Sequence, residues 1–223
     1  MPLFLSSIAA GALITCGFTP TDPAPEPSSF LERSTRAARA RLFEERYSIP
    51  LPDLPPGAPV PPLIMERPPI RELPFDHSAA VMIGRVAGQQ TFLSSDRTQL
   101  YTEFSVAGDE IFKNERPDVK AGVPLTILVE GGALRLTSGR ILRQEAPGDV
   151  CPLQVGPRYV LFLEYWSKAD AFQILAAWEL RDNSPVPLEP GHQALAKHGK
   201  CSVCGQDEAQ FLIGVRAASR ASK

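Results

Sequence analysis

The side chains most able to react or to bind a metal ion lie near the end of the chain, in the stretch KHGKCSVCGQDEAQ. Two residues separate Cys201 from Cys204 in this stretch. Two thiols at this spacing can hold a metal ion, exchange with other thiols or oxidise to a disulfide. Zinc takes four ligands, so His192 and His198 would have to complete a set of two cysteines and two histidines. The resulting spacing, His-x5-His-x2-Cys-x2-Cys, is not a familiar zinc motif and is a weak signal for metal binding.

Two further interpretations of the cysteine pair remain open. A thioredoxin-type redox pair opens a helix after a strand, and the residues after Gly205 do favour a helix, but the required α/β context is missing. A structural disulfide is the interpretation that we favour. It would join Cys201 to Cys204, or it would join one of them to Cys151 and tie the tail to the preceding domain.

The rest of the sequence lacks a recognisable catalytic constellation. It contains three histidines, and no Gly-x-Ser-x-Gly elbow, phosphate-binding glycine loop or His-Glu-x-x-His motif. Its formal net charge of −2 provides no general attraction to nucleic acid. We therefore expect a protein that is not an enzyme, requires no cofactor and does not bind nucleic acid.

Residues 1–18 have the character of an export signal or lipoprotein signal. The run from Leu3 to Phe18 is almost entirely apolar or small, which suits a secretory signal but is too short to span a bilayer. No lysine or arginine precedes this run. The sequence LITC, ending at Cys16, resembles the lipobox of bacterial lipoproteins, although Thr15 replaces the usual Gly, Ala or Ser. We predict export, to the periplasm, to the outer membrane as a lipoprotein or to the medium, with Cys16 as the candidate lipidation site. The alternative is a cytoplasmic chain with an apolar N-terminal helix.

Residues 19–74 are predicted to form a proline-rich tether that contains one helix. Most of the 23 prolines fall between Pro20 and Pro74, and prolines at this density favour an extended polyproline II conformation. Between two such stretches, Ser29 and Glu32 form a capping box ahead of a run of good helix formers. This pattern predicts a helix over about residues 30–47.

Residues 75–182 carry the predicted core, a series of short apolar or alternating segments separated by turn residues. Segments such as AAVMIGRVAG, QLYTEFSVAGDEIF and VGPRYVLFLEY occur with no helical pattern between most of them. Ser138 and Gly139 mark a tight hairpin. This arrangement predicts an all-β barrel or sandwich, followed over residues 183–223 by a tail with the cysteine pair and a C-terminal helix.

The order of these segments resembles the OB-like barrel of the tissue inhibitors of metalloproteinases and the netrin-like modules. It is more similar still to a group of exported bacterial proteins of unassigned function, which carry G-V, Y-T, V-x-E-V-x-K, G-G and V-G-x-x-Y-L-L-F-L motifs in the same order. The resemblance spans about residues 79–180 and implies an OB-like barrel, closed or partly open. The matching positions are Gly84, Val86, Tyr101, Thr102, Glu110, Lys113, Gly131, Gly132, Val155, Gly156, Tyr159, Phe162 and Leu163.

The resemblance does not transfer the inhibitory activity. The metalloproteinase inhibitors act through an N-terminal cysteine that reaches the zinc of the target, and no equivalent precedes the first strand, where the sequence is LPFDHSAAV. Their disulfide framework is also absent. The related bacterial group generally reaches its last helix without a Cys-x-x-Cys pair, so this pair is a local elaboration. We therefore expect a non-catalytic binding or protein-interaction module of unknown ligand.

The loops of such a barrel suggest a candidate binding rim. Gly131 and Gly132 in one loop and Arg135 and Arg140 on the next hairpin could form a basic rim for a partner in the cell envelope: a protein, an anionic glycan or a lipid headgroup. The simpler interpretation is that the glycines serve backbone turns and the arginines are ordinary surface charge. Contact with the membrane would come from the N-terminal lipid alone. The alternative function is a zinc-binding or thiol-redox protein centred on the Cys-x-x-Cys pair.

Overall fold

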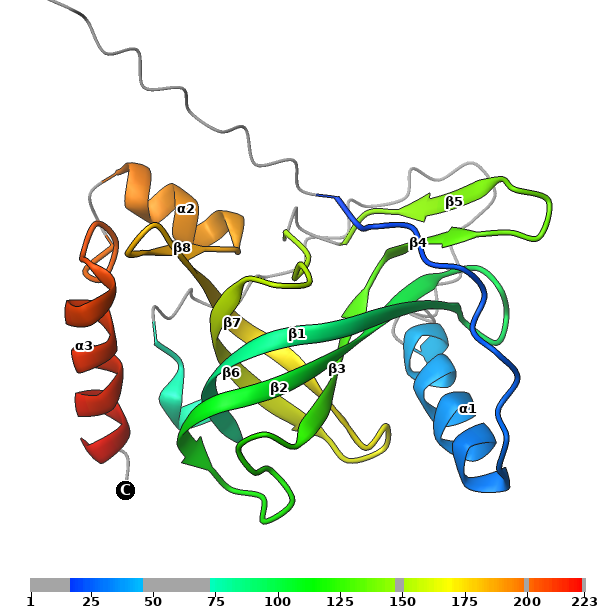
Figure 1. The fold of residues 1–223 in the computed structure, drawn as a ribbon, viewed down its shortest axis with the longest axis horizontal. Coiled ribbons are helices and arrows are strands. Elements are labelled where there is room, and N and C mark those ends of the chain that lie inside the picture. Colours follow the sequence, from blue (N-terminus) through cyan, green and yellow to red (C-terminus); the bar gives the residue numbers. More distant parts are fainter. Residues whose placement is uncertain (1–16, 46–72, 147–150, 199–200, 222–223) are drawn as a thin grey trace, which may run out of the picture.

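The computed structural model describes residues 17–45, 73–146, 151–198 and 201–221 (Figure 1). Residues 1–16, with Cys16, and most of the second proline-rich stretch lie outside this description. Among the described helices, none is long and apolar enough to cross a membrane. Outside the main sheet, the elements are α1 (Phe30–Glu45), η1 (Phe75–His77), β4 (Gly132–Arg135), β5 (Ile141–Gln144), α2 (Pro190–Lys197) and α3 (Glu208–Ala221).

The core of the molecule is a six-stranded sheet with the order β3-β2-β1-β6-β7-β8. Its strands are β1 (Ala80–Leu93), β2 (Leu100–Asn114), β3 (Pro124–Glu130), β6 (Arg158–Trp166), β7 (Ala171–Arg181) and β8 (Ser184–Pro187). Neighbouring strands are antiparallel, and one parallel bridge between Ile127 and Phe172 joins β3 to β7. Five strands thus form a ring of hydrogen-bonded neighbours, which confirms the predicted, predominantly β core.

The two longest strands, β1 and β2, are paired irregularly. Their register shifts at three points, including Ile83/Gly84 and Val86/Gly88, and such shifts increase the local twist of a strand pair. At Gly84, a Cβ atom would come within 2.8 Å of the Ala107 carbonyl oxygen. The close approach of the two strands therefore requires a glycine.

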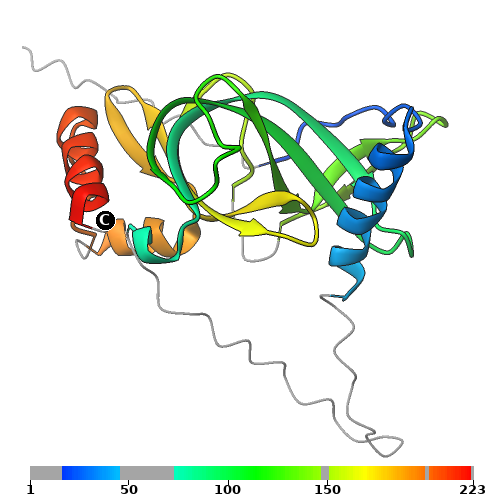
Figure 2. The ribbon, with the colours of Figure 1, turned by 90° about the horizontal axis from the view of Figure 1, so that it is seen from below.

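Three apolar clusters stabilise this arrangement. The first draws on all five strands of the ring and has Phe104 among its fully buried members. The second joins β1, β6 and β7 to α3, with Trp178 and Phe211 at its centre. The third lies under α1, where Phe43 stacks on Tyr101 with ring centroids 4.8 Å apart. Figures 1 and 2 show α1 and α3 at opposite ends of the strands.

Helix α1 confirms the predicted N-terminal helix within the described range. The Ser29 hydroxyl accepts the Glu32 N–H at 3.1 Å, as the capping box predicts. The Glu32 carboxylate reaches back one residue further than expected and accepts the Ser28 N–H at 2.9 Å. The two end residues of the predicted helix, 46 and 47, lie outside the described residues.

The first residues of the predicted tether are paired with the folded domain. Thr21 donates its N–H to the Ala133 carbonyl oxygen at 2.9 Å, and its own carbonyl oxygen accepts the Arg135 N–H at 2.8 Å. Thr21 therefore lies beside β4, as a third strand would. Phe18, which we assigned to the export signal, is buried in the first cluster. The folded domain thus begins before the boundary that composition suggested.

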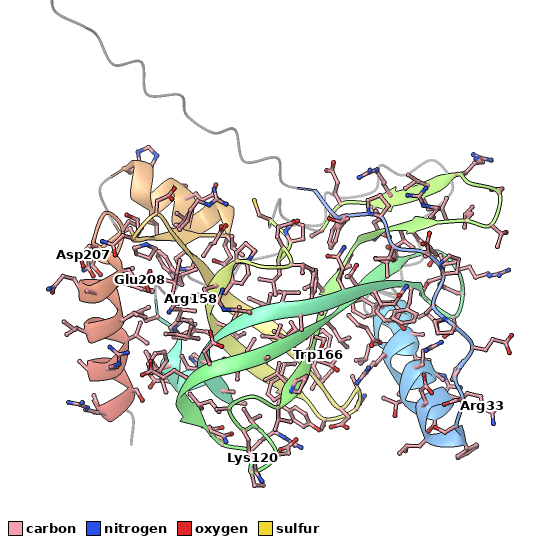
Figure 3. The ribbon with its side chains drawn as sticks, viewed as in Figure 1. Arg33, Lys120, Arg158, Trp166, Asp207 and Glu208 are labelled. Carbon is pink, nitrogen blue, oxygen red and sulfur yellow. A yellow bond between two sulfur atoms is a disulfide. The ribbon has the colours of Figure 1, made fainter. Side chains whose placement is uncertain are left out.

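The C-terminal tail holds two helices where the sequence predicts one. Helix α3 is the predicted one, and Figure 3 shows how Glu208 at its start meets Arg158 on β6, with 3.0 Å between the charged atoms. Helix α2 is missing from the prediction, although a proline at the first position, here Pro190, is typical of helix N-termini. The predicted hairpin at Ser138 and Gly139 is confirmed as the turn between β4 and β5.

Candidate functional site

A cleft opens where β3 and β7 meet, and we call it the seam cleft. It has a volume of about 200 Å³. Its walls come from β3, the β2–β3 connection, the β6–β7 hairpin and one arginine of α1. The lining residues are Arg39, Asp118, Val119, Val123, Pro124, Leu125, Thr126, Tyr165, Asp170 and Phe172.

The seam opens because β3 is well paired on one edge and poorly paired on the other. Seven residue pairs join β3 to β2, whereas the single bridge at Ile127 joins it to β7. The cleft lies at the N-terminal half of β3, on the turn side of the β6–β7 hairpin. Tyr165 and Phe172 are cross-strand partners in that hairpin, with ring centroids 5.3 Å apart. Together with the buried Val119, they form the apolar part of a lining that is otherwise mainly polar.

Polar groups at the edge of the seam cleft are held in fixed positions. Tyr165 donates its hydroxyl proton to Asp170 at 2.6 Å, and this hydrogen bond raises the tyrosine pKa. Arg116 makes two hydrogen bonds of 3.0 Å to Asp118, which lower the pKa of that carboxyl. The Arg116 guanidinium also lies 3.6 Å from the centroid of the Tyr165 ring. These contacts connect the β2–β3 connection to the β6–β7 hairpin across the cleft.

Arg39 extends from α1 and closes one end of the cleft. Its guanidinium donates to Glu103 on β2 at 2.7 Å and to the carbonyl oxygens of Ala169 and Asp170 at 3.1 and 3.2 Å. The side chains of the ion pair are 14% and 17% exposed. The positive charge of Arg39 is therefore already paired with the Glu103 carboxylate. The arginine side chain fixes the β6–β7 turn relative to α1 and β2.

Beneath Arg39, the environment disfavours charge. Burial raises the pKa of Glu103, and the neighbouring Arg39 opposes this effect only in part. Burial and the Glu103 charge together raise the pKa of Tyr101. Within the described residues, the Tyr101 hydroxyl and one carboxylate oxygen of Glu103 have no hydrogen-bond partner. The charged form of Glu103 is thus accommodated at a cost in stability.

We expect Glu103→Gln to change the pH dependence of folding. Because burial raises the folded-state pKa of Glu103 above its ordinary value of 4.5, this group contributes stability below that pH and loses the contribution as the pH rises through the folded-state pKa. The glutamine variant lacks this titration. The unfolding free energy of the wild type minus that of the variant should therefore fall as the pH rises from the ordinary value of 4.5 through the folded-state pKa.

Urea denaturation of both proteins across this range measures the difference. Glu115→Gln is the matched control, because the Glu115 side chain is 59% exposed in its pair with Lys113 and should show no comparable fall. A wild-type advantage that grows with pH would contradict the expectation, since it would mean that attraction to Arg39 outweighs burial.

The structure separates the four residues of the predicted binding rim. Arg135 and Arg140 are exposed on the β4–β5 hairpin, and Arg135 lies 3.3 Å from the carboxylate of Asp22. Gly131 directly precedes β4 and Gly132 is its first residue, and both are buried, so they present no surface with the arginines. The hairpin follows the C-terminal end of β3, whereas the seam cleft lies near its N-terminal end.

The predicted metal ligands are distributed over α2 and the loop that follows it. Cys201 and Cys204 form a disulfide with 5.3 Å between their Cα atoms, as the first of our two disulfide interpretations predicts. The second is wrong, because Cys151 is also disulfide-bonded, to neither of these two. His192 is buried with its Nδ1 atom 3.2 Å from a Glu189 carboxylate oxygen. His198, in contrast, is exposed.

The disulfide form offers no thiolate to a metal ion. No cluster of three or more potential ligands among His, Cys, Asp and Glu occurs in the described part of the chain. Zinc binding by the reduced cysteines with His192 and His198 therefore stays a prediction, and it would require reduction of the disulfide first.

Comparison with known proteins assigns no function to the seam cleft or to the Cys201–Cys204 disulfide. No protein-family model matches the chain, no curated protein matches it, and no solved structure matches it. The resemblance to the metalloproteinase inhibitors and to the exported bacterial group consequently stays a prediction.

Proposed function

We propose that this protein is a non-catalytic, exported binding module whose seam cleft receives a side chain from an extended peptide of a partner protein in the cell envelope. The observation that carries the proposal is the weak pairing between β3 and β7. A strand with a poorly paired edge beside a cavity is the arrangement that peptide-binding sheets use: the backbone of the ligand pairs with the edge and alternate side chains enter pockets.

The chemistry of the cleft favours a peptide over an anionic ligand. Its lining combines apolar groups from Val119, Leu125 and Phe172 with two carboxylates. The arginine of the lining, Arg39, already faces the Glu103 carboxylate and two carbonyl oxygens. A sulfated glycan or a lipid headgroup would have to displace Glu103 to gain a cation, and a buried carboxylate left unpaired is costly.

We also propose that the core is an OB-like barrel, and the strand arrangement supports this assignment. A five-stranded ring with one weakly closed seam is what a partly open OB-like barrel requires. In such barrels the connections at the edge of the sheet form the binding face. Here the β2–β3 connection, with Lys120 at its exposed end (Figure 3), and the β6–β7 hairpin border the seam cleft.

Selection of peptides from a random phage-displayed library on the purified protein tests this function. Val123 lines the cleft and is 48% exposed, so Val123→Arg places a charge at the cleft without removing core contacts. Ile213→Arg is the matched control, because Ile213 is 55% exposed on α3 and does not line the cleft. We expect selected peptides to bind the Val123 variant at least about tenfold more weakly than the wild type and the Ile213 variant equally well.

Equal binding of the selected peptides to both variants would overturn the assignment of the cleft. Failure to select any peptide, together with binding to anionic glycans or vesicles, would overturn the ligand class. The second result would favour Arg135 and Arg140 on the β4–β5 hairpin as the binding site.

Export and lipidation can be tested on the same protein. The chain has four cysteines, and Cys151 is disulfide-bonded to neither Cys201 nor Cys204. Intact mass of the protein from the envelope fraction should show a diacylglyceryl addition if Cys16 is lipidated, and recovery from the cytoplasm alone would contradict export.

A further inference from the structure

The Cys201–Cys204 disulfide lies in the loop between α2 and α3, away from the seam cleft. Cys201 is 9% exposed and belongs to the second apolar cluster, beside residues such as Val203 and Phe211. Cys204 is only partly buried. The two sulfurs therefore differ in access: a reagent from solvent reaches Cys204 more readily than Cys201.

This disulfide contributes little to the position of α3, because other contacts hold the helix against the sheet. Arg216 makes two hydrogen bonds, of 3.0 and 2.8 Å, to Glu110 on β2. The start of the helix is joined to β6 through Arg158 and Glu208. A cross-link between residues three apart closes a very short loop, and closing a short loop removes less chain entropy from the unfolded state than closing a long one. Stability alone therefore does not account for the bond.

The backbone already supports one of the sulfurs as a leaving group. The Cys204 N–H lies 3.0 Å from the Cys201 sulfur and donates to it. The same donor would stabilise a thiolate on Cys201 if the disulfide were opened, because hydrogen bonding to the charged form favours that form. The Cys201 sulfur is thus the better leaving group when the disulfide opens. The Cys204 sulfur is the one that a thiolate from solvent can attack.

We propose that Cys201–Cys204 is a thiol–disulfide exchange site that oxidises a dithiol. One thiolate of the dithiol attacks the Cys204 sulfur, the Cys201–Cys204 bond breaks, and its electron pair passes to the Cys201 sulfur. The second thiol of the substrate loses its proton to solvent and attacks the substrate sulfur of the mixed disulfide, which releases Cys204 as a thiolate. The substrate leaves with a disulfide, and two electrons and two protons end on Cys201 and Cys204.

The structure provides an internal control for this site. Cys151 is also disulfide-bonded and 8% exposed, and it belongs to the first apolar cluster. Partial reduction of the native, full-length protein by dithiothreitol, followed by alkylation and peptide mass mapping, compares the two bonds in one sample. We expect Cys201–Cys204 to be reduced at least about tenfold faster than the Cys151 disulfide. Fluorescence of the buried Trp178 should stay unchanged throughout.

A second measurement identifies the attacked sulfur. With glutathione, a monothiol that lacks the second thiol needed for the intramolecular step, the mixed disulfide should form on Cys204. The Cys201→Ser variant should take up glutathione from its oxidised form at least about tenfold faster than the Cys204→Ser variant, which leaves only the buried thiol. Reduction of both bonds at one rate, reduction only when Trp178 becomes exposed, or an adduct on Cys201 would each overturn the proposal. None of these results bears on the seam cleft, so this inference and the proposed function can fail separately.

Discussion

Replacing Gly131 with alanine should destabilise the fold by on the order of 3 kcal/mol, the sum of a backbone cost and a packing cost. Gly131 has φ of +89°, in the region that disfavours side chains. A Cβ atom there would lie 2.8 Å from the Gln144 carbonyl oxygen and 2.9 Å from the Ala146 backbone nitrogen. Both contacts are with backbone atoms, so no side-chain rotation can relieve them. Urea denaturation followed by circular dichroism measures the loss.

Gly139→Ala is the matched control for this effect. Gly139 has φ of +82°, but no heavy atom lies within 4 Å of the position that its Cβ atom would occupy. Its substitution should cost about 1 kcal/mol, from the left-handed backbone alone. Equal losses in the two variants would contradict the tight packing of the β3–β4 turn against β5. The predicted difference also favours a structural role for Gly131 over a role in a binding rim.

Trp178→Ala should cost about 4 kcal/mol, which is in the range for removing a fully buried aromatic side chain. The Trp178 side chain is completely buried on β7. Its ring lies 5.3 Å from that of Phe211 on α3 and 5.4 Å from that of His192 on α2. It therefore joins both C-terminal helices to the sheet, and we expect them to exchange their amide hydrogens faster in the variant.

Ile213→Ala provides the comparison for the tryptophan variant. Ile213 lies on α3 but is 55% exposed, and its truncation should change the unfolding free energy by less than about 0.5 kcal/mol. Hydrogen exchange measured by mass spectrometry distinguishes loss of the helices from global loss of stability. Unchanged exchange in α2 and α3 of the Trp178 variant would contradict the role of this side chain as their anchor.

Local patterns account for the parts of the fold that the sequence predicted. The Ser29 capping box starts α1 because its hydrogen bonds involve only neighbouring residues. The β4–β5 hairpin follows from the turn at Ser138 and Gly139 for the same reason. Buried and partly buried residues alternate in β2 from Thr102 to Gly108, which is the pattern of a strand with one face toward a core.

The seam cleft could not be predicted in this way, because its residues meet only through the tertiary fold. Arg39 bonds the carbonyl oxygens of Ala169 and Asp170, about 130 positions along the chain. The opening itself follows from a missing part of a strand pairing, and no residue type signals such a gap. The nearest indication was the turn-rich stretch around Asp118, which the sequence marks as a break between strands.

The contact between Thr21 and β4 was missed for a related reason. The local proline content predicts an extended conformation but does not say whether the extended segment is free or paired. In the structure Thr21 is hydrogen-bonded to Ala133 and Arg135. Composition alone therefore placed the domain boundary too late in the chain.

The most direct test of the central claim, that the seam cleft binds an extended peptide, is amide chemical-shift mapping of the isotope-labelled protein during titration with a selected peptide. The account predicts that the largest shifts occur at cleft residues such as Val119, Leu125 and Phe172, with little change on the β4–β5 hairpin and on α3. Shifts confined to the hairpin around Arg135 and Arg140, with none along β3, would contradict it.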